Sequence, residues 1–180
     1  MENTTTKTAF DLITFPVRIT TERLNITDVY ESDKALYAEL YKDDELNRYY
    51  GYDYREDLKG ENPTPDYFYN FFRGLKSKKE EYSLAVRLGG VMIGEIVLYT
   101  FSAWEEKTAE IGFRFFREHQ KKGYARESVS AVLKFMKDAG FIRAKCKCYK
   151  ENLPSFRLIT ALEFRRISSD EKYFYFEKTL

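Results

Sequence analysis

A short stretch rich in positive charge, "HQKKGYAR" (residues 119–126), has the residue types needed to hold an anion. Gly123 has no Cβ and lets a ligand approach the main chain closely, and Lys121 and Lys122 add positive charge beside it. A helical pattern begins at Tyr124, and the first N–H groups of a helix lack internal partners. Such a helix start is a natural site for phosphate. An ordinary strand-to-helix turn with solvated lysines would look the same, so the residues alone leave both interpretations open.

The spacing around this glycine excludes two common kinds of phosphate loop. Neither the GxxxxGK[ST] pattern nor the GxGxxG pattern occurs in the chain. The pattern that does occur is Gln120, two residues, Gly123, one residue, Ala125. Alone, this pattern indicates only an anion-binding helix start.

Hydrophobic periodicity predicts the elements that position this stretch. Two strands within residues 81–100 join at Gly89-Gly90, a dipeptide suited to a tight hairpin. Helices are predicted at 32–43, 66–75, 124–139 and 153–164, and further strands at 23–30, 107–116, 142–149 and, as a hairpin, 165–180. Early helices followed by an antiparallel meander indicate an α+β fold. We expect a partly ordered segment over residues 1–20 and one domain over 21–180.

Composition limits the classes of protein to which the chain can belong. The 180 residues suit one domain, and the 30 basic and 29 acidic residues give a net charge of +1, which argues against nucleic-acid binding. Cys146 and Cys148 alternate with lysines in a strand, so we interpret them as reduced core residues. These two cysteines and one distant histidine make no metal site. No apolar run reaches the length of a membrane span and no secretory signal is evident, so we expect a cytoplasmic protein.

The Gln-x-x-Gly-x-Ala pattern, placed after an antiparallel meander and at the start of a long helix, resembles the acyl-CoA pyrophosphate loop of the GNAT superfamily of N-acyltransferases. The resemblance runs from about Thr21 to Leu180. It includes "TERLNITDV", "GGVMIGEIVLY", "AEIGFRFF" and the Asn-x-x-Ser segment in "KENLPSFRLITALEF". The chain is most similar to the branch that contains the ribosomal-protein N-terminal acetyltransferases.

The resemblance implies a single GNAT-like α+β domain with a mixed, mostly antiparallel sheet flanked by helices. The sheet is expected to splay between its fourth strand (about Ile111 to Phe116) and its fifth, at Cys146. The implied co-substrate is acetyl-CoA, with its pyrophosphate on the main chain of residues 120–125 and its pantetheine arm in the splay. The implied cofactor-binding residues are Phe113, Phe115, Gln120, Lys121, Lys122, Gly123, Tyr124, Ala125 and Asn152.

The implied reaction is direct attack of a primary amine on the thioester in a ternary complex, with no covalent nucleophile from the protein. Ser155, three residues after Asn152, is the candidate acid for the departing thiolate, and Tyr149 is a weaker one. Glu110 is the first candidate base, acting directly or through water, and Glu95 is the reserve. A capping serine and salt-bridged carboxylates are the structural alternatives. We interpret His119 as a solvated loop residue.

The acceptor side is predicted from an acidic and aromatic segment between the early helices. Its acidic residues are Asp43, Asp44, Glu45, Asp53, Glu56 and Asp57, and its tyrosines include Tyr49, Tyr50 and Tyr52. They would attract a small cationic molecule or a peptide N-terminus, unless they form only a solvated surface. Glu163 stands where the family commonly has glycine, and we expect it to resist a left-handed helix end.

Two other functions compete with an N-acetyltransferase. The first is a non-catalytic acyl-CoA-binding module, and the second is a nucleic-acid-binding domain, which the charge balance disfavours. The aromatic closing strands ("YFYFEKTL") would either pack inside or pair with a second copy as a homodimer. The sequence does not name the acceptor.

Overall fold

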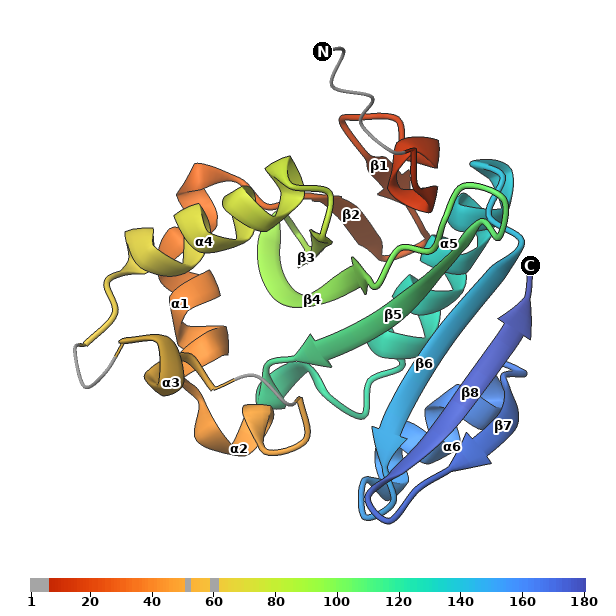
Figure 1. Ribbon diagram of the computed structural model, residues 1–180. Helices are drawn as coiled ribbons and strands as arrows, with labels where there is room; N and C mark the ends of the chain where they lie inside the picture. Colours follow the sequence, from red (N-terminus) through yellow and green to blue (C-terminus); the bar gives the residue numbers. More distant parts are fainter. Residues whose placement is uncertain (1–6, 51–52, 59–61) are drawn as a thin grey trace.

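One open, mixed sheet organises the chain (Figure 1). The computed structural model describes residues 7–50, 53–58 and 62–180. Within them the strands are β1 (Arg18–Thr20), β2 (Leu24–Asp28), β3 (Glu81–Leu88), β4 (Val91–Tyr99), β5 (Thr108–Phe115), β6 (Arg143–Tyr149), β7 (Arg165–Ser169) and β8 (Tyr173–Thr179). They lie in the order β1-β2-β3-β4-β5-β6-β8-β7, and all neighbours are antiparallel except β5 and β6, which are parallel. The predicted α+β fold is confirmed.

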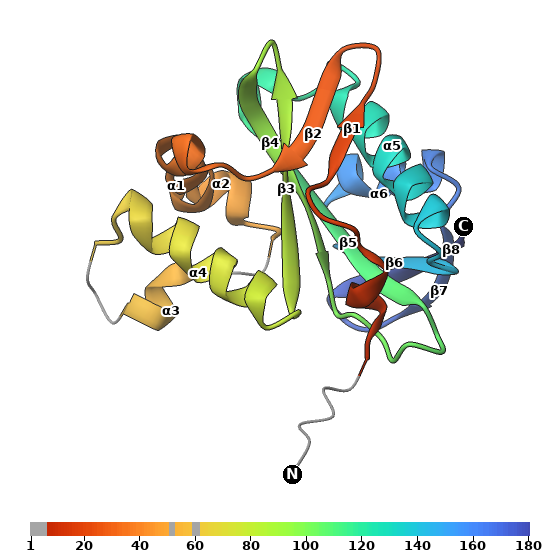
Figure 2. The same cartoon turned by 90° about the horizontal axis from the view of Figure 1, so that it is seen from above.

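Helices cover both faces of the sheet (Figure 2). They are α1 (Lys34–Lys42), α2 (Asp44–Asn47), α3 (Tyr54–Leu58) and α4 (Pro65–Ser77) on one face, and α5 (Tyr124–Asp138) and α6 (Leu153–Ala161) on the other. Short 3-10 helices lie at η1 (Ala9–Leu12), η2 (Glu31–Asp33) and η3 (Arg117–His119). Each face has its own core: α1 and α4 bury aromatic side chains such as Tyr37 and Phe68, and α5 buries Val129, Val132 and Met136. The sheet therefore separates two compartments.

Local sequence explains the elements next to residues 119–126, the predicted anion-binding stretch. Gly89 and Gly90 both have positive φ, +58° and +87°, as the tight turn between β3 and β4 requires. Helix α5 places its apolar residues at helical spacing on one side, and Gly140, whose φ is +98°, follows its C-cap residue Ala139. The predicted hairpin and the predicted long helix are confirmed.

The N-terminal segment contributes to the core from residue 9 onward. Ala9, Phe10, Ile13 and Val17 are buried, and β1 extends the edge of the sheet beside β2. The division of the chain at residue 20 stays a prediction. No helix among residues 7–50, 53–58 and 62–180 is long and apolar enough to cross a membrane.

The end of α6 differs from the expectation for Glu163. This residue has φ +64°, so it adopts the left-handed conformation that we expected a glutamate to resist. The turn is held by Phe164 N–H, which donates to Ile159 O at 3.2 Å, and by the burial of the Phe164 ring. Tertiary packing thus imposes a backbone conformation that costs an L residue roughly 1–2 kcal/mol.

Replacing Glu163 by glycine should stabilise the protein. Glycine removes the left-handed strain but adds chain entropy to the unfolded state, so the expected gain is about 0.5–1 kcal/mol in the free energy of unfolding. Urea unfolding would measure it. The control is Glu163→Ala, which removes the same exposed contact with Lys178 and keeps the strain. A glycine variant no more stable than the alanine variant would contradict this account.

Candidate active site

Strands β5 and β6 pair for only three residues and then separate. Thr108, Ala109 and Glu110 pair with Arg143, Ala144 and Lys145, and no later pair joins the two strands. Figure 1 shows the strands diverging toward the end of β5 that leads into the anion-binding stretch. The main-chain groups that face this gap have lost their ladder partners and need others. The predicted splay between these strands is confirmed.

A cavity of about 300 Å³ occupies this gap, and we call it the wedge cavity. Its walls combine the central residues of β5, the end of β6, the start of α6 and a group of tyrosines. The lining residues are Tyr49, Tyr50, Glu81, Val97, Tyr99, Ile111, Gly112, Phe113, Cys146, Lys147, Cys148, Tyr149, Asn152, Ser155, Ile159 and Tyr173. Both cysteines are free and buried, as predicted, and they also form part of this wall.

A second cavity of about 410 Å³ lies at the start of α5, and we call it the loop cavity. The main-chain N–H groups of residues 121–126 have no acceptor in the part of the chain that the structure describes. Gly123 has φ +85° and Lys121 has φ +58°, so successive peptide groups turn around a concave surface. Together with the positive end of a 15-residue helix, these amides suit a phosphate group.

The predicted cofactor-binding residues gather around these two cavities. Phe113, Phe115, Gln120, Lys121, Gly123, Tyr124, Ala125 and Asn152 line the loop cavity, the wedge cavity or both. Lys122 does not line either, and its carbonyl accepts a hydrogen bond from Arg23 instead. His119, which we expected to be solvated, is half-buried and lines the loop cavity.

Ser155 and Asn152 lie where the two cavities meet, because both residues line both. Asn152 caps α6: its Oδ1 accepts a hydrogen bond from the Ser155 main-chain N–H at 3.2 Å. Pro154 fits this first turn because the position needs no N–H donor. The Ser155 hydroxyl has no partner among the described residues, so its proton is free for a bound group.

An ion pair that the sequence did not reveal braces the anion-binding stretch. Arg23, just before β2, binds Glu127 in the first turn of α5 through Nε–Oε2 (2.7 Å) and Nη2–Oε2 (2.6 Å). Thr21 Oγ1 donates to Glu127 Oε1 at 2.5 Å. Burial would raise the pKa of Glu127, but these hydrogen bonds outweigh burial and lower it. The residues lie more than 100 positions apart, and no local pattern links them.

The two candidate bases have different surroundings. Glu95 is fully buried, and its Oε1 contacts Arg114 Nη2 at 2.6 Å, so it neutralises a buried cation and does not reach the wedge cavity. Glu110 is half-buried and pairs across the sheet with Tyr99, which does line the cavity, although Glu110 itself does not. Burial and, next, the nearby charge of Glu110 raise the pKa of Tyr99.

Four of the six residues of the predicted acidic segment form ion pairs with two arginines. Asp43 and Glu45 bind Arg117, and Asp44 and Asp53 bind Arg55. Tyr52 and the side chain of Asp57 lie outside the described residues. Tyr49 and Tyr50 line the wedge cavity, so the aromatic part of the predicted acceptor slot is present. The four carboxylates paired with Arg55 and Arg117 are less available to a cationic acceptor.

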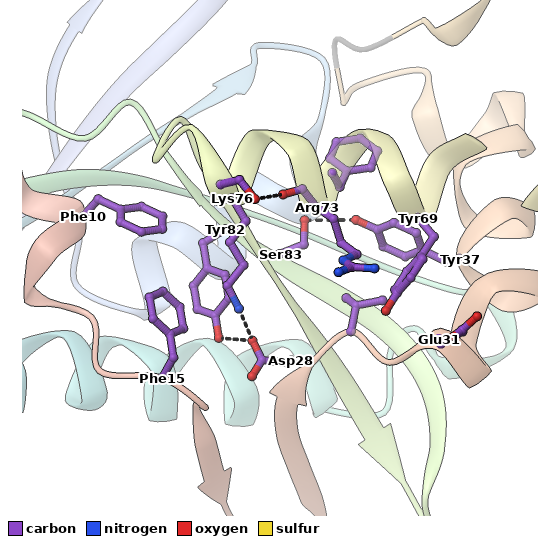
Figure 3. Close-up of a pocket in the computed structure, with 13 residues that line it drawn as sticks. Phe10, Phe15, Asp28, Glu31, Tyr37, Tyr69, Arg73, Lys76, Tyr82 and Ser83 are labelled. Carbon is purple, nitrogen blue, oxygen red and sulfur yellow. Dashed lines mark hydrogen bonds and ion pairs between the residues drawn. The ribbon is translucent and has the colours of Figure 1, made fainter. Parts of the chain in front are cut away.

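A larger cavity, of about 670 Å³, lies away from both, between α4, β3 and the N-terminal segment. Figure 3 shows Asp28 joined to both Tyr82 and Lys76, and Ser83 joined to Tyr37. Asp28 Oδ1 lies 2.6 Å from the Tyr82 hydroxyl and 2.8 Å from Lys76 Nζ. This cavity contains none of the predicted site residues. The wedge and loop cavities, although smaller, therefore form the candidate active site.

Comparisons with known proteins agree with this geometry. Residues 23–165 match the family model described as the acetyltransferase (GNAT) domain. An uncharacterized N-acetyltransferase of Bacillus subtilis, YnaD, is 31% identical over 153 residues, which cover 83% of this chain and 84% of YnaD. A GNAT-family acetyltransferase structure from Bacillus anthracis superposes with a TM-score of 0.72 at 25% identity, covering 91% of this chain and 98% of that one.

The fold extends to the ribosomal-protein branch that the sequence resembles. RimL, a ribosomal L7/L12 α-N-protein acetyltransferase in complex with coenzyme A, superposes with a TM-score of 0.74 at 15% identity. The match covers 91% of this chain and 98% of RimL. With a family match over most of the chain, a relative above 30% identity and a sheet that splays beside a helix start with free main-chain amides, this chain belongs to the acetyltransferase (GNAT) family.

Proposed function

We propose that the protein transfers an acetyl group from acetyl-CoA to a primary amine. One observation carries the proposal: the free main-chain amides at the start of α5 border a cavity that shares Asn152 and Ser155 with the cavity in the gap between β5 and β6. A diphosphate and a slender amide-bearing arm have the shape and the hydrogen-bonding groups that these two spaces require.

The residues fit acetyl-CoA along its length. The amides of residues 121–126 would hold the pyrophosphate, with Lys121 adding charge, and Gln120 is positioned by a hydrogen bond from its Nε2 to Phe115 O at 2.9 Å. Phe113 and the unpaired edges of β5 and β6 would border the pantetheine arm. The thioester would then lie near Ser155, at the junction of the cavities.

The thiols in the wall favour direct attack by the amine. Burial raises the pKa of Cys146, and burial also raises the pKa of Cys148, so both thiols stay protonated at neutral pH and are poor nucleophiles. The amine nitrogen therefore forms the new bond to the thioester carbon as the carbon–sulfur bond breaks. Ser155 would donate its proton to the departing thiolate, and the positive end of α6 would favour the developing charge.

The acceptor would enter from the tyrosine side of the wedge cavity. Tyr49 and Tyr50 can contact an ammonium group by cation–π interaction, which suits a small cationic amine or a peptide N-terminus. Glu110 remains a candidate base, but it does not line the wedge cavity, whereas Tyr99, which pairs with it, does. Glu110 would therefore act through the Tyr99 hydroxyl or through water.

The function is tested by a thiol-release assay with acetyl-CoA and a panel of peptides, polyamines and aminoglycosides, together with calorimetry of coenzyme A binding. We expect uptake of coenzyme A and thiol release with at least one amine. Failure to bind coenzyme A would overturn the assignment, and binding without turnover on any amine would favour a non-catalytic acyl-CoA-binding module.

Replacing Gly123 by glutamate should abolish coenzyme A binding, because an anion would stand where the pyrophosphate is held. A side chain here also meets a positive φ and Arg23 Nη2, which lies 3.3 Å from the position of a Cβ. Gly123→Gln is the matched control, since it has the same size and strain without the charge. We expect glutamate to weaken the calorimetric Kd at least about 100-fold more than glutamine, or roughly 2.7 kcal/mol. Equal losses would place the pyrophosphate elsewhere.

Replacing Ser155 by alanine should lower kcat by about 10²-fold and leave the Kd of coenzyme A unchanged, as expected for loss of a proton donor. Ser155→Cys should recover part of the rate because a thiol can also donate a proton. Thr160→Ala, an exposed hydroxyl on the same helix, is the control for helix stability. If Ser155→Ala keeps the full kcat, Ser155 is not the proton donor.

A further inference from the structure

Glu81, at the start of β3, is a carboxyl group in the wall of the wedge cavity that the mechanism so far does not use. It is half-buried, and it is the one acidic side chain among the described residues that line this cavity. In the sequence it follows "KSKKE", where it resembles part of a solvated charge run. The structure instead turns its side chain toward the tyrosines of the proposed acceptor site.

The register of the sheet explains why Glu81 reaches the cavity. Glu81 pairs with Tyr99 on β4, and Tyr99 pairs with Glu110 on β5. Directly paired residues project from the same face of a sheet, so Tyr99 stands between the two carboxylates. Glu81 and Tyr99 line the cavity and Glu110 does not. Of the two carboxylates, Glu81 therefore has the direct route to a bound amine.

Groups from several elements face Glu81. Ser83, on the same strand, hydrogen-bonds to it, and the Ser83 hydroxyl accepts a hydrogen bond from Tyr37 at 3.0 Å (Figure 3). Because Ser83 Oγ accepts from Tyr37, its own proton is available for the carboxylate. The buried pair of Glu95 and Arg114 lies on the same side of the sheet and contributes one charge of each sign.

The remaining neighbours are phenols and one lysine. Burial raises the pKa of Tyr50 and of Tyr99, and the charge of Glu81 raises each further, so both phenols stay protonated. Lys147 lines the cavity from β6 and is exposed. Burial and, next, the charge of Glu95 raise the pKa of Glu81 to about 8, while Arg114 and Ser83 oppose the rise. Such a carboxyl group accepts a proton from an ammonium far more readily than an ordinary glutamate does.

We propose that Glu81 binds the ammonium group of the acceptor and receives its proton, with Ser83 as a positioning residue. This inference rests on the proposed acetyl transfer. The N–H bond of the ammonium breaks and an O–H bond forms on Glu81, which leaves a neutral amine. Its nitrogen lone pair attacks the thioester carbon, the carbon–sulfur electrons leave with the thiolate, and Ser155 supplies the thiolate's proton. Ser155 recovers a proton from the new amide nitrogen, and Glu81 releases its own proton to water.

The test compares Glu81→Gln with wild type on the amine that shows turnover in the thiol-release panel. We expect kcat to fall by about 10²-fold with the Kd of coenzyme A unchanged. In wild type, kcat/KM should rise with pH through about 8, because only the ionised carboxylate accepts a proton, and the variant should lose this inflection. Glu81→Asp should keep the inflection at a reduced rate. Glu80→Gln, the exposed neighbour, is the matched control.

A second measurement does not need an acceptor. In protein labelled with carbon-13 at glutamate carboxyls, one resonance should titrate near pH 8 in wild type and in Glu80→Gln and be absent in Glu81→Gln. The lack of such a resonance, or a Glu81→Gln enzyme with wild-type kcat and pH profile, overturns the inference. So does a Glu110→Gln variant that alone removes the inflection. A wild-type protein that binds no coenzyme A instead overturns the proposed function itself.

Discussion

The separation of β5 from β6 is the constraint on which the rest of the site depends. Three residue pairs hold the strands in parallel, and beyond Glu110 and Lys145 the ladder stops. In an unbroken sheet these main-chain groups would hydrogen-bond to one another, and no ligand could enter.

In this sheet the unpaired main-chain groups border a cavity of about 300 Å³. Helix α6 begins at the edge of this cavity, so that the cap at Asn152 places Ser155 at the opening. The end of β5 then leads through η3 to the free amides of α5. The proposed binding of acetyl-CoA therefore depends more on the interrupted hydrogen bonding between β5 and β6 than on any single side chain.

A buried ion pair beneath the acceptor side has a structural role. Arg114 and Glu95 are almost completely buried, and the Arg114 guanidinium lies 3.6 Å from the centre of the Tyr41 ring and 4.1 Å from that of Tyr50. It also hydrogen-bonds Asn47 at the end of α2. Burying two charges costs solvation that their attraction only partly recovers, but removing one partner leaves the other uncompensated. The pair therefore joins the helical layer to the sheet, and it makes Glu95 unsuited to proton transfer. Glu81, which lacks an ion-pair partner among the described residues, keeps that capacity.

The sequence predicted the parts of the molecule that local rules specify. The Gly89-Gly90 hairpin, the apolar stripe of α5 and the glycine-containing turn before that helix all follow from periodicity and from the backbone freedom of glycine. Helices α2 and α3 were not predicted, because helices of four and five residues are held by tertiary contacts and carry no periodic signal.

The expectation for Glu163 was wrong because burial of Phe164 outweighs the preference of glutamate for a negative φ. Glu81 and the Arg23–Glu127 brace depend on strand register and on contacts across the chain, which one sequence does not encode in any short pattern.

One strand connects donor and acceptor through its alternating faces. Ile111 and Phe113 of β5 lie toward the side of α5 and α6, whereas Gly112 lies toward the tyrosines. A Cβ on Gly112 would stand 3.3 Å from Tyr99 Cε1 and 3.9 Å from the Tyr50 ring. Because Gly112 has no side chain, both phenol rings can pack closely against β5. Only the thickness of the backbone then separates the two compartments at this point. In the proposed mechanism, an amine held by Glu81 and the tyrosines on one side meets a thioester on the other at the point where β6 has separated from β5.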